Sequence, residues 1–292
     1  MKTQRFGIAA VSGAVLSGSL LMSAPALAQQ PWSFSANIGA VSNYIWRGVT
    51  QTGDQAAIQG GIDVGHESGF YAGTWASNID WDEGGSEDVV GIVPVDPNTG
   101  LPMTDADGNY IVEGVTSGSD PASPNYELDF YAGFSGAIND DVSYDIGAIY
   151  YAYPDGRESD FAEISLSGSF KWFTLGVAYT VYGENDDGLF DDGDLYYFGG
   201  ADFALPYDFG LSLRAGYYQF ENDDVVVGSV TDTSGNVIDL TESANYWHYG
   251  ASITREAGDF GTFGLNWDQN NGDQEVGYDT DPKIWVSWSK EF

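Results

Sequence analysis

The feature that most constrains this chain is a strict alternation of apolar and polar residues. In "YELDFYAGF" (126–134), Leu128, Phe130 and Ala132 fall on one face, while Glu127 and Asp129 fall on the other. The segments "VSYDIGAIYY" (142–151) and "FAEISLSGSF" (161–170) repeat the pattern. Because successive side chains of a strand point to opposite faces, this period of two predicts strands with one apolar face.

The same pattern predicts twelve strands, at 33–47, 56–66, 69–80, 125–138, 142–153, 161–170, 173–183, 195–205, 209–220, 244–254, 260–268 and 282–292. The connections alternate in length. Short ones such as "ES" and "PYD" take turns with long ones such as 183–194, 221–243 and 268–281. Short turns on one rim and long loops on the other are typical of an all-β, transmembrane, antiparallel up-and-down barrel, with periplasmic turns and extracellular loops.

The start of the chain is typical of an exported protein. Lys2 and Arg5 precede an apolar run that ends in Ala26-Leu27-Ala28, so residues 1–28 are expected to be a cleaved signal peptide. The remainder, 29–292, is expected to form a single outer-membrane barrel domain with a long extracellular insert at 81–124. This part of the sequence contains no uninterrupted run of about 18 apolar residues, so it predicts no membrane-spanning helix.

Composition excludes several classes of function. The chain has nine Lys+Arg against 44 Asp+Glu, which argues against a nucleic-acid partner, whose phosphates require basic patches. It has no cysteine, so it can form neither disulfides nor thiolate metal sites. The partners expected instead are outer-membrane lipid and lipopolysaccharide, small solutes that are mainly cations, and, during assembly, periplasmic chaperones and the outer-membrane assembly machinery.

A secreted β-sandwich or a lipocalin-like barrel also alternates, but it turns its apolar face inward. Two features favour the membrane. The chain ends in Phe292 on an amphipathic strand, which resembles the barrel-assembly signal of Gram-negative outer-membrane proteins. Aromatics also gather at strand ends, as in interfacial girdles. The predicted interface aromatics are Trp46, Trp75, Tyr150, Trp172, Trp247, Trp267 and Trp288.

Two stretches resemble a known family. Residues 34–81, "FSANIGAVSNYIWRGVTQTGDQAAIQGGIDVGHESGFYAGTWASNIDW", are similar to the opening of the TorF family of porins, and "DIGAIYYAYP" (145–154) is similar to a second landmark of it. The chain departs from this family mainly at 82–124. The resemblance implies a barrel in the outer membrane of a Gram-negative cell that forms a pore. It implies no substrate and no catalytic motif.

Alternate residues of a strand point to opposite faces of the barrel wall, and this parity of position assigns charged side chains to the lumen. In the strand expected at 33–47, Tyr44 and Trp46 face outward, so Arg47 points inward. The predicted channel-lining residues are Arg47, Asp63, Glu127, Asp129, Asp145, Glu163, Asp202, Arg214 and His248. This acidic lumen predicts a porin-like channel for passive diffusion of small hydrophilic solutes, with a preference for cations. Alternatively, these charges pair with one another and fill a narrow barrel.

Other functions remain open. A plugged barrel could act through its acidic loops as an adhesin or receptor. An outer-membrane hydrolase would need a base beside a nucleophile, but the two histidines, His66 and His248, lie in no recognisable motif with a serine. The stretch 105–114 begins like a calcium loop, yet Tyr110 stands where such a loop needs glycine. We therefore expect no enzymatic activity, no cofactor and no specific metal site.

Overall fold

Twelve strands form a closed antiparallel barrel in the computed structural model, which describes residues 31–81, 123–156, 158–185, 189–231 and 237–292. The predicted signal peptide, the stretch 105–114 and nearly all of the insert 81–124 lie outside these residues. The barrel strands are β1 (Trp32–Val41), β4 (Ala57–His66), β5 (Phe70–Asn78), β6 (Tyr126–Asn139), β7 (Val142–Ala152), β8 (Phe161–Phe170), β9 (Phe173–Gly183), β10 (Leu195–Leu205), β11 (Phe209–Gln219), β14 (Tyr246–Glu256), β15 (Thr262–Asn270) and β16 (Lys283–Glu291).

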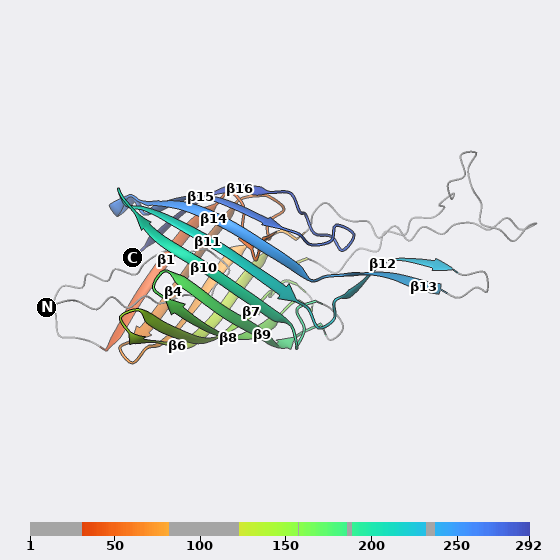
Figure 1. Cartoon of the computed structure of the whole chain (residues 1–292), viewed down its shortest axis with the longest axis horizontal. Helices are drawn as coiled ribbons and strands as arrows, with labels where there is room; N and C mark the ends of the chain where they lie inside the picture. The colour runs from red at the N-terminus through yellow and green to blue at the C-terminus, as the bar shows by residue number, and fades with distance from the viewer. Residues whose placement is uncertain (1–30, 82–122, 157, 186–188, 232–236) are drawn as a thin grey trace, which may run out of the picture.

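The barrel closes through β1, which pairs with β16 on one edge and with β4 on the other; Ala40, for example, lies opposite both Trp288 and Ile58. The start of β1 and the end of β16 lie at one end of the barrel, together with the short turns (Figure 1). At the long-loop end, the hairpin β12 (Asp224–Thr231) and β13 (Val237–Ser243) extends away from the barrel. The predicted closed barrel of twelve antiparallel strands is thus confirmed.

Helix is almost absent from the part of the chain that the structure describes. A single 3-10 turn, η1 (Gly258–Phe260), lies in the connection between β14 and β15. Within the described ranges, no helix has the length and apolarity needed to cross a membrane.

The two faces of the barrel wall differ in polarity. Large apolar side chains cover the outside: Phe34, Ile58 and Ile62 are 75%, 63% and 61% exposed. The inside carries buried carboxylates such as Asp129 and Glu163. Removing apolar surface from water gains about 25 cal/mol of free energy per Å², so a wall of this kind would be unfavourable in water. The structure therefore excludes the sandwich and lipocalin-like alternatives, whose apolar faces point inward.

The predicted C-terminal end of the first strand is wrong. The strand expected at 33–47 stops at Val41, and residues 42–56 turn into the lumen, where β2 (Ile45–Trp46) pairs with β3 (Val49–Thr50). We call residues 42–56 the lumen hairpin. Its residues 43–47 are all buried, which a strand with one exposed face cannot achieve. At its tip, Arg47 and Gly48 have φ of 48° and 81°. Two consecutive positive φ values are what a type I′ turn requires.

The prediction that Trp46 and Trp75 lie at the membrane interface is also wrong. Trp46 belongs to the lumen hairpin, and Trp75 lies on the inward face of β5 together with Tyr71; both tryptophans are buried. An aromatic near a strand end can face either side, and here the parity of β5, with Phe70 outward, turns Trp75 inward. Of the other five, Tyr150, Trp172 and Trp247 are exposed and Trp267 and Trp288 partly so. Their place at a membrane interface stays a prediction.

Candidate functional site in the barrel lumen

The tip of the lumen hairpin crosses the barrel and places Arg47 against the opposite wall. Its guanidinium donates two parallel hydrogen bonds to Glu163 on β8, from Nη1 to Oε1 at 2.8 Å and from Nη2 to Oε2 at 2.6 Å. Arg47 Cζ lies 3.9 Å from the ring centroid of Tyr196 on β10 and 5.0 Å from that of Tyr218 on β11. We call Glu163, Tyr196 and Tyr218 the wall box. The box neutralises a cation that would otherwise be too costly to bury.

Gly48 brings the tip against two further strands. Asn270 on β15 donates from Nδ2 to the Gly48 carbonyl at 2.9 Å. A Cβ added to Gly48 would lie 2.4 Å from Cβ of His248 on β14. Both the positive φ and the close approach therefore require glycine at this position.

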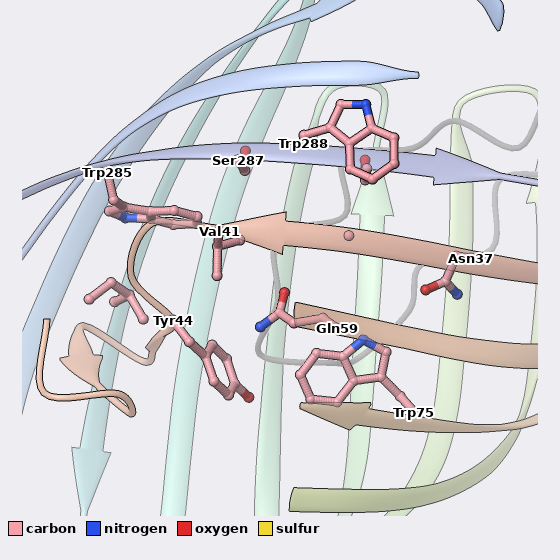
Figure 2. Close-up of a pocket in the computed structure, with 11 residues that line it drawn as sticks. Asn37, Val41, Tyr44, Gln59, Trp75, Trp285, Ser287 and Trp288 are labelled. Carbon is pink, nitrogen blue, oxygen red and sulfur yellow. The ribbon is translucent and has the colours of Figure 1, made fainter. Parts of the chain in front are cut away.

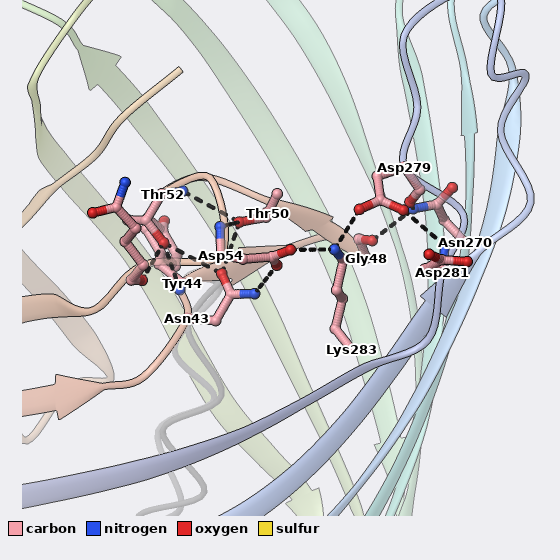
Figure 3. A network of polar contacts seen from close by, with 11 residues as sticks. Asn43, Tyr44, Gly48, Thr50, Thr52, Asp54, Asn270, Asp279, Asp281 and Lys283 are labelled. Atoms are coloured by element: carbon pink, nitrogen blue, oxygen red, sulfur yellow. Dashed lines mark hydrogen bonds and ion pairs between the residues drawn. The ribbon is translucent and has the colours of Figure 1, made fainter. Parts of the chain in front are cut away.

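The base of the hairpin is held by charged and polar contacts (Figure 3). Asn43 Nδ2 donates to Asp54 Oδ1 at 2.6 Å, and Lys283 Nζ lies 2.5 Å from Asp54 Oδ2. Lys283 also pairs with Asp279, and this hydrogen bond holds the pKa of the Asp279 carboxyl below its usual range. The hairpin is thus tied both to β16 and to the loop that precedes it.

Aromatic side chains fill the lumen around the hairpin at the long-loop end. Trp46 packs edge-on against Tyr151 and Phe161, and Phe190 reaches in from the loop between β9 and β10 to contact Trp46 and Phe161. The buried cluster continues through Tyr218, Phe220 and Tyr246. This layer closes much of the cross-section, because its members are buried by one another rather than exposed to a wide channel.

A second ion pair lies on the wall itself. Arg214 on β11 donates to Asp268 on β15, from Nε at 3.0 Å and from Nη2 at 2.5 Å, and to Ser252 Oγ at 2.7 Å. Trp285 Nε1 donates to the same carboxylate at 2.8 Å. Asp268 was missed by the parity argument. The signal was present, because Asn266, Asp268 and Asn270 alternate with Leu265 and Trp267.

The nine residues predicted to line the lumen all lie on its inner side, although Arg47 reaches it from the hairpin and not from a strand. Both arginines are neutralised, by Glu163 and Asp268. Four of the other five predicted carboxylates accept a hydrogen bond from a neutral hydroxyl: Asp63 from Tyr131, Glu127 from Tyr44, Asp145 from Tyr71 and Asp202 from Ser212. Glu127 also shares a hydrogen bond with Asp129. Asp129 Oδ1 is buried without a hydrogen-bond partner among the described residues. Whether these residues line a conducting path stays a prediction.

A small cavity lies in the lumen beside the hairpin (Figure 2). It has a volume of about 40 Å³, and Asn37, Gln59, Tyr44, Trp75 and Trp285 contribute to its walls. A water molecule needs about 10–15 Å³ measured in this way, so the cavity can hold a few waters but no solute of metabolite size. Together with the buried aromatic layer, this leaves the lumen narrow at the level of the hairpin.

The two histidines make different contacts. His248 shares a hydrogen bond of 2.8 Å between Nε2 and the Tyr196 hydroxyl inside the barrel. His66 lies at the short-turn end, where Nδ1 accepts from the Ser68 backbone at 3.1 Å and contacts Ser68 Oγ at 2.8 Å. These contacts stabilise the turn between β4 and β5. Within the described ranges, no group of three or more His, Cys, Asp or Glu side chains is placed to hold a metal ion.

No curated protein matches this chain in sequence. Solved structures with a similar outline include the KdgM porin, with 8% identity and a TM-score of 0.44 over 87% of this chain and 98% of that one. The NanC porin has 11% identity and a TM-score of 0.43 over 89% of this chain and 98% of that one. A TodX deltaS2S3 mutant, described as a monoaromatic hydrocarbon channel, has 10% identity and a TM-score of 0.45 over 91% of each chain.

At these TM-scores the structural similarity does not establish a shared function, and the barrel is established by the chain's own strand pairing. The match to a family model is of a different kind, because it spans most of the chain, from residue 25 to residue 286. The chain therefore belongs to the family described as "Bacterial protein of unknown function (Gcw_chp)".

Proposed function

We propose that this protein is a porin-like channel of the Gram-negative outer membrane, through which small hydrophilic solutes diffuse passively with a preference for cations. The observation that carries the proposal is the distribution of side chains over the barrel wall. An apolar band faces outward, as lipid requires, and a charged, hydrogen-bonding surface faces inward. The resemblance of residues 34–81 to TorF-family porins agrees with this reading. No cofactor and no catalytic residue takes part.

The expected orientation places the short turns in the periplasm and the long loops outside the cell, as in other outer-membrane barrels. The chain has no cysteine, so a single introduced one reports its own exposure. We expect Gln274→Cys, in a long loop, to react with a membrane-impermeant maleimide on intact cells. Tyr207→Cys, in a short turn where Tyr207 is 84% exposed, should react only after the outer membrane is opened. Labelling of Tyr207→Cys on intact cells would contradict the orientation.

The lumen has two parts. Toward the short turns it carries Asp63, Asp145 and Asp202, of which Asp202 is exposed and Asp63 half-buried. Toward the long loops it is constricted by the lumen hairpin and the aromatic layer. Fixed charges are screened over only about 10 Å at 0.1 M salt, so a path this narrow still feels them. Conduction at full rate then requires the hairpin to move away from the wall box.

Selectivity tests this proposal. We expect the zero-current potential of the protein in a planar bilayer, under a potassium chloride gradient, to have the cation-selective sign and to shrink as salt rises. Replacing Asp63, Asp145 and Asp202 with asparagine should reduce it, because their charge is not neutralised by a lumen arginine. A matched control removes three carboxylates from exposed turns at the same end, through Glu67→Gln, Asp140→Asn and Asp259→Asn. An anion-selective sign, or equal effects of the two triple variants, would contradict the proposal.

A second function is favoured by the aromatic layer and by the hairpin β12–β13, which extends beyond the barrel (Figure 1). A permanently plugged barrel would act through its outer surface as an adhesin or receptor. The bilayer measurement separates the two functions, since a permanently plugged barrel gives no current in the wild type, whatever a variant without the hairpin conducts.

A further inference from the structure

The wall box and its occupant come from different parts of the fold. Glu163, Tyr196 and Tyr218 project from β8, β10 and β11, whose backbones are held in the barrel by strand pairing on both sides, with a shift of register between β8 and β9 beside Glu163. Arg47 reaches the box from the lumen hairpin, a separate two-stranded unit that is not paired with the barrel sheet. The box is therefore a feature of the wall, and the arginine is a group docked into it.

We propose that the wall box is a binding site for the guanidinium group of a solute, and that Arg47 occupies it as an internal stand-in for that solute. The proposal rests on the proposed function in one respect, namely that the solute reaches the box through the lumen. The ligand class is a small cation with a terminal guanidinium group, such as arginine, its amides or agmatine.

The geometry selects a guanidinium over other cations. Both oxygens of Glu163 are engaged at once, by Nη1 and Nη2, as the planar fork of a guanidinium allows and a point-like ammonium does not. Tyr196 and Tyr218 lie within cation–π distance of the same group, at 3.9 and 5.0 Å. A neutral urea of the same shape would leave the Glu163 charge buried without a counter-ion.

A second polar group of the solute could also be recognised. The Tyr218 hydroxyl is fully buried and has no hydrogen-bond partner among the described residues. A buried hydroxyl without a partner is unfavourable, and it can donate to or accept from a substituent next to the guanidinium. The box thus offers a carboxylate, two aromatic rings and one further hydrogen-bonding group.

Competition with Arg47 determines how the wild type responds. An intramolecular group competes at an effective concentration in the millimolar range or above, so an external guanidinium must bind more weakly to the wild type than to a protein without Arg47. When it does bind, Arg47 must leave. Solute binding and withdrawal of the hairpin tip are then two aspects of one equilibrium.

The experiment uses the full-length mature chain in detergent, with binding measured by calorimetry and not by current. In Arg47→Ala, the missing side-chain atoms correspond to N-ethylguanidinium, which is the probe. We expect it to bind Arg47→Ala at least about tenfold more tightly than the wild type. N-Ethylurea and ethylammonium should bind more weakly than the guanidinium probe. The double variant Arg47→Ala/Glu163→Gln should lose binding. Arg255→Ala, which removes an exposed arginine outside the lumen, should bind as the wild type does.

Weak but saturable binding of agmatine to the wild type, with the order above in the variants, supports the proposal. Absence of binding to a folded Arg47→Ala protein, as judged by circular dichroism, overturns it. So does binding to Arg47→Ala with none to the wild type, since the box would then be permanently closed. The outcome is independent of the channel: binding without current contradicts the proposed function alone, and current without binding contradicts this inference alone.

Discussion

Excision of the lumen hairpin is expected to raise the single-channel conductance several-fold. Val41 at the end of β1 pairs directly with Ala57 at the start of β4, so a short Gly-Ser turn can join them in place of residues 43–55 without disturbing the barrel. The excision removes Tyr44, Trp46 and Arg47 from the lumen, and with them the layer that bridges the opposite walls. The measurement is the conductance of the refolded variant in a planar bilayer, compared with the wild type at the same salt concentration.

A milder variant guards against a failure to fold. Gly48→Ala keeps the hairpin but brings a Cβ to 2.4 Å from His248, at a residue whose φ is 81°. The control is Gly258→Ala, at a φ of 57° with no atom within 4 Å of the added Cβ. Both variants strain the backbone, but only the first drives the tip away from the wall. We expect a higher or more frequently open conductance for Gly48→Ala alone. Wild-type conductance in both the excision and the Gly48 variant would show that the hairpin does not limit the path.

The second large effect concerns the stability of the pair between Arg47 and Glu163. Each single change, Arg47→Met or Glu163→Gln, leaves one buried charge without its partner, and we expect each to lower the free energy of unfolding by about 3–5 kcal/mol. The double variant leaves no buried charge at this site. Its loss should therefore be smaller than the sum of the two single losses by about 2 kcal/mol or more. The measurement is urea-induced unfolding of the protein from lipid vesicles and its refolding into them.

The chain contains a matched control for this cycle. Lys171 and Asp141 form an ion pair at 3.9 Å in a short turn, with side chains that are 50% and 55% exposed. The corresponding cycle there should give a coupling of about 0–1 kcal/mol, because water screens both charges. Equal couplings at the two sites would show that the Arg47–Glu163 pair is not buried in the folded protein.

Several properties of this chain are local and could be predicted from the sequence alone. The alternation of apolar and polar residues predicted β8 at 161–170, β9 at 173–183 and β10 at 195–205 with the bounds that the structure has. The same parity placed Glu163, Arg214 and His248 inside the barrel. The physical reason is that the period of a strand comes from its own backbone geometry, so each stretch of ten residues carries the information by itself.

Tertiary structure decided what those side chains do. Arg47 pairs with a residue 116 positions away, and Gly48 contacts Asn270 across 222 positions. No local pattern distinguishes "SNYIWRGVTQ" as the end of a strand from the same residues folded into the lumen, since aromatics beside a charge fit a strand that faces lipid as well as a hairpin packed inside the barrel. The inward turn of Trp46 and Trp75 and the pairing of Arg214 with Asp268 were settled in the same way. Closing the sheet into a barrel brings side chains from distant strands together in one interior. The best partners for a buried guanidinium are whichever carboxylate and rings the opposite strands bring to that level.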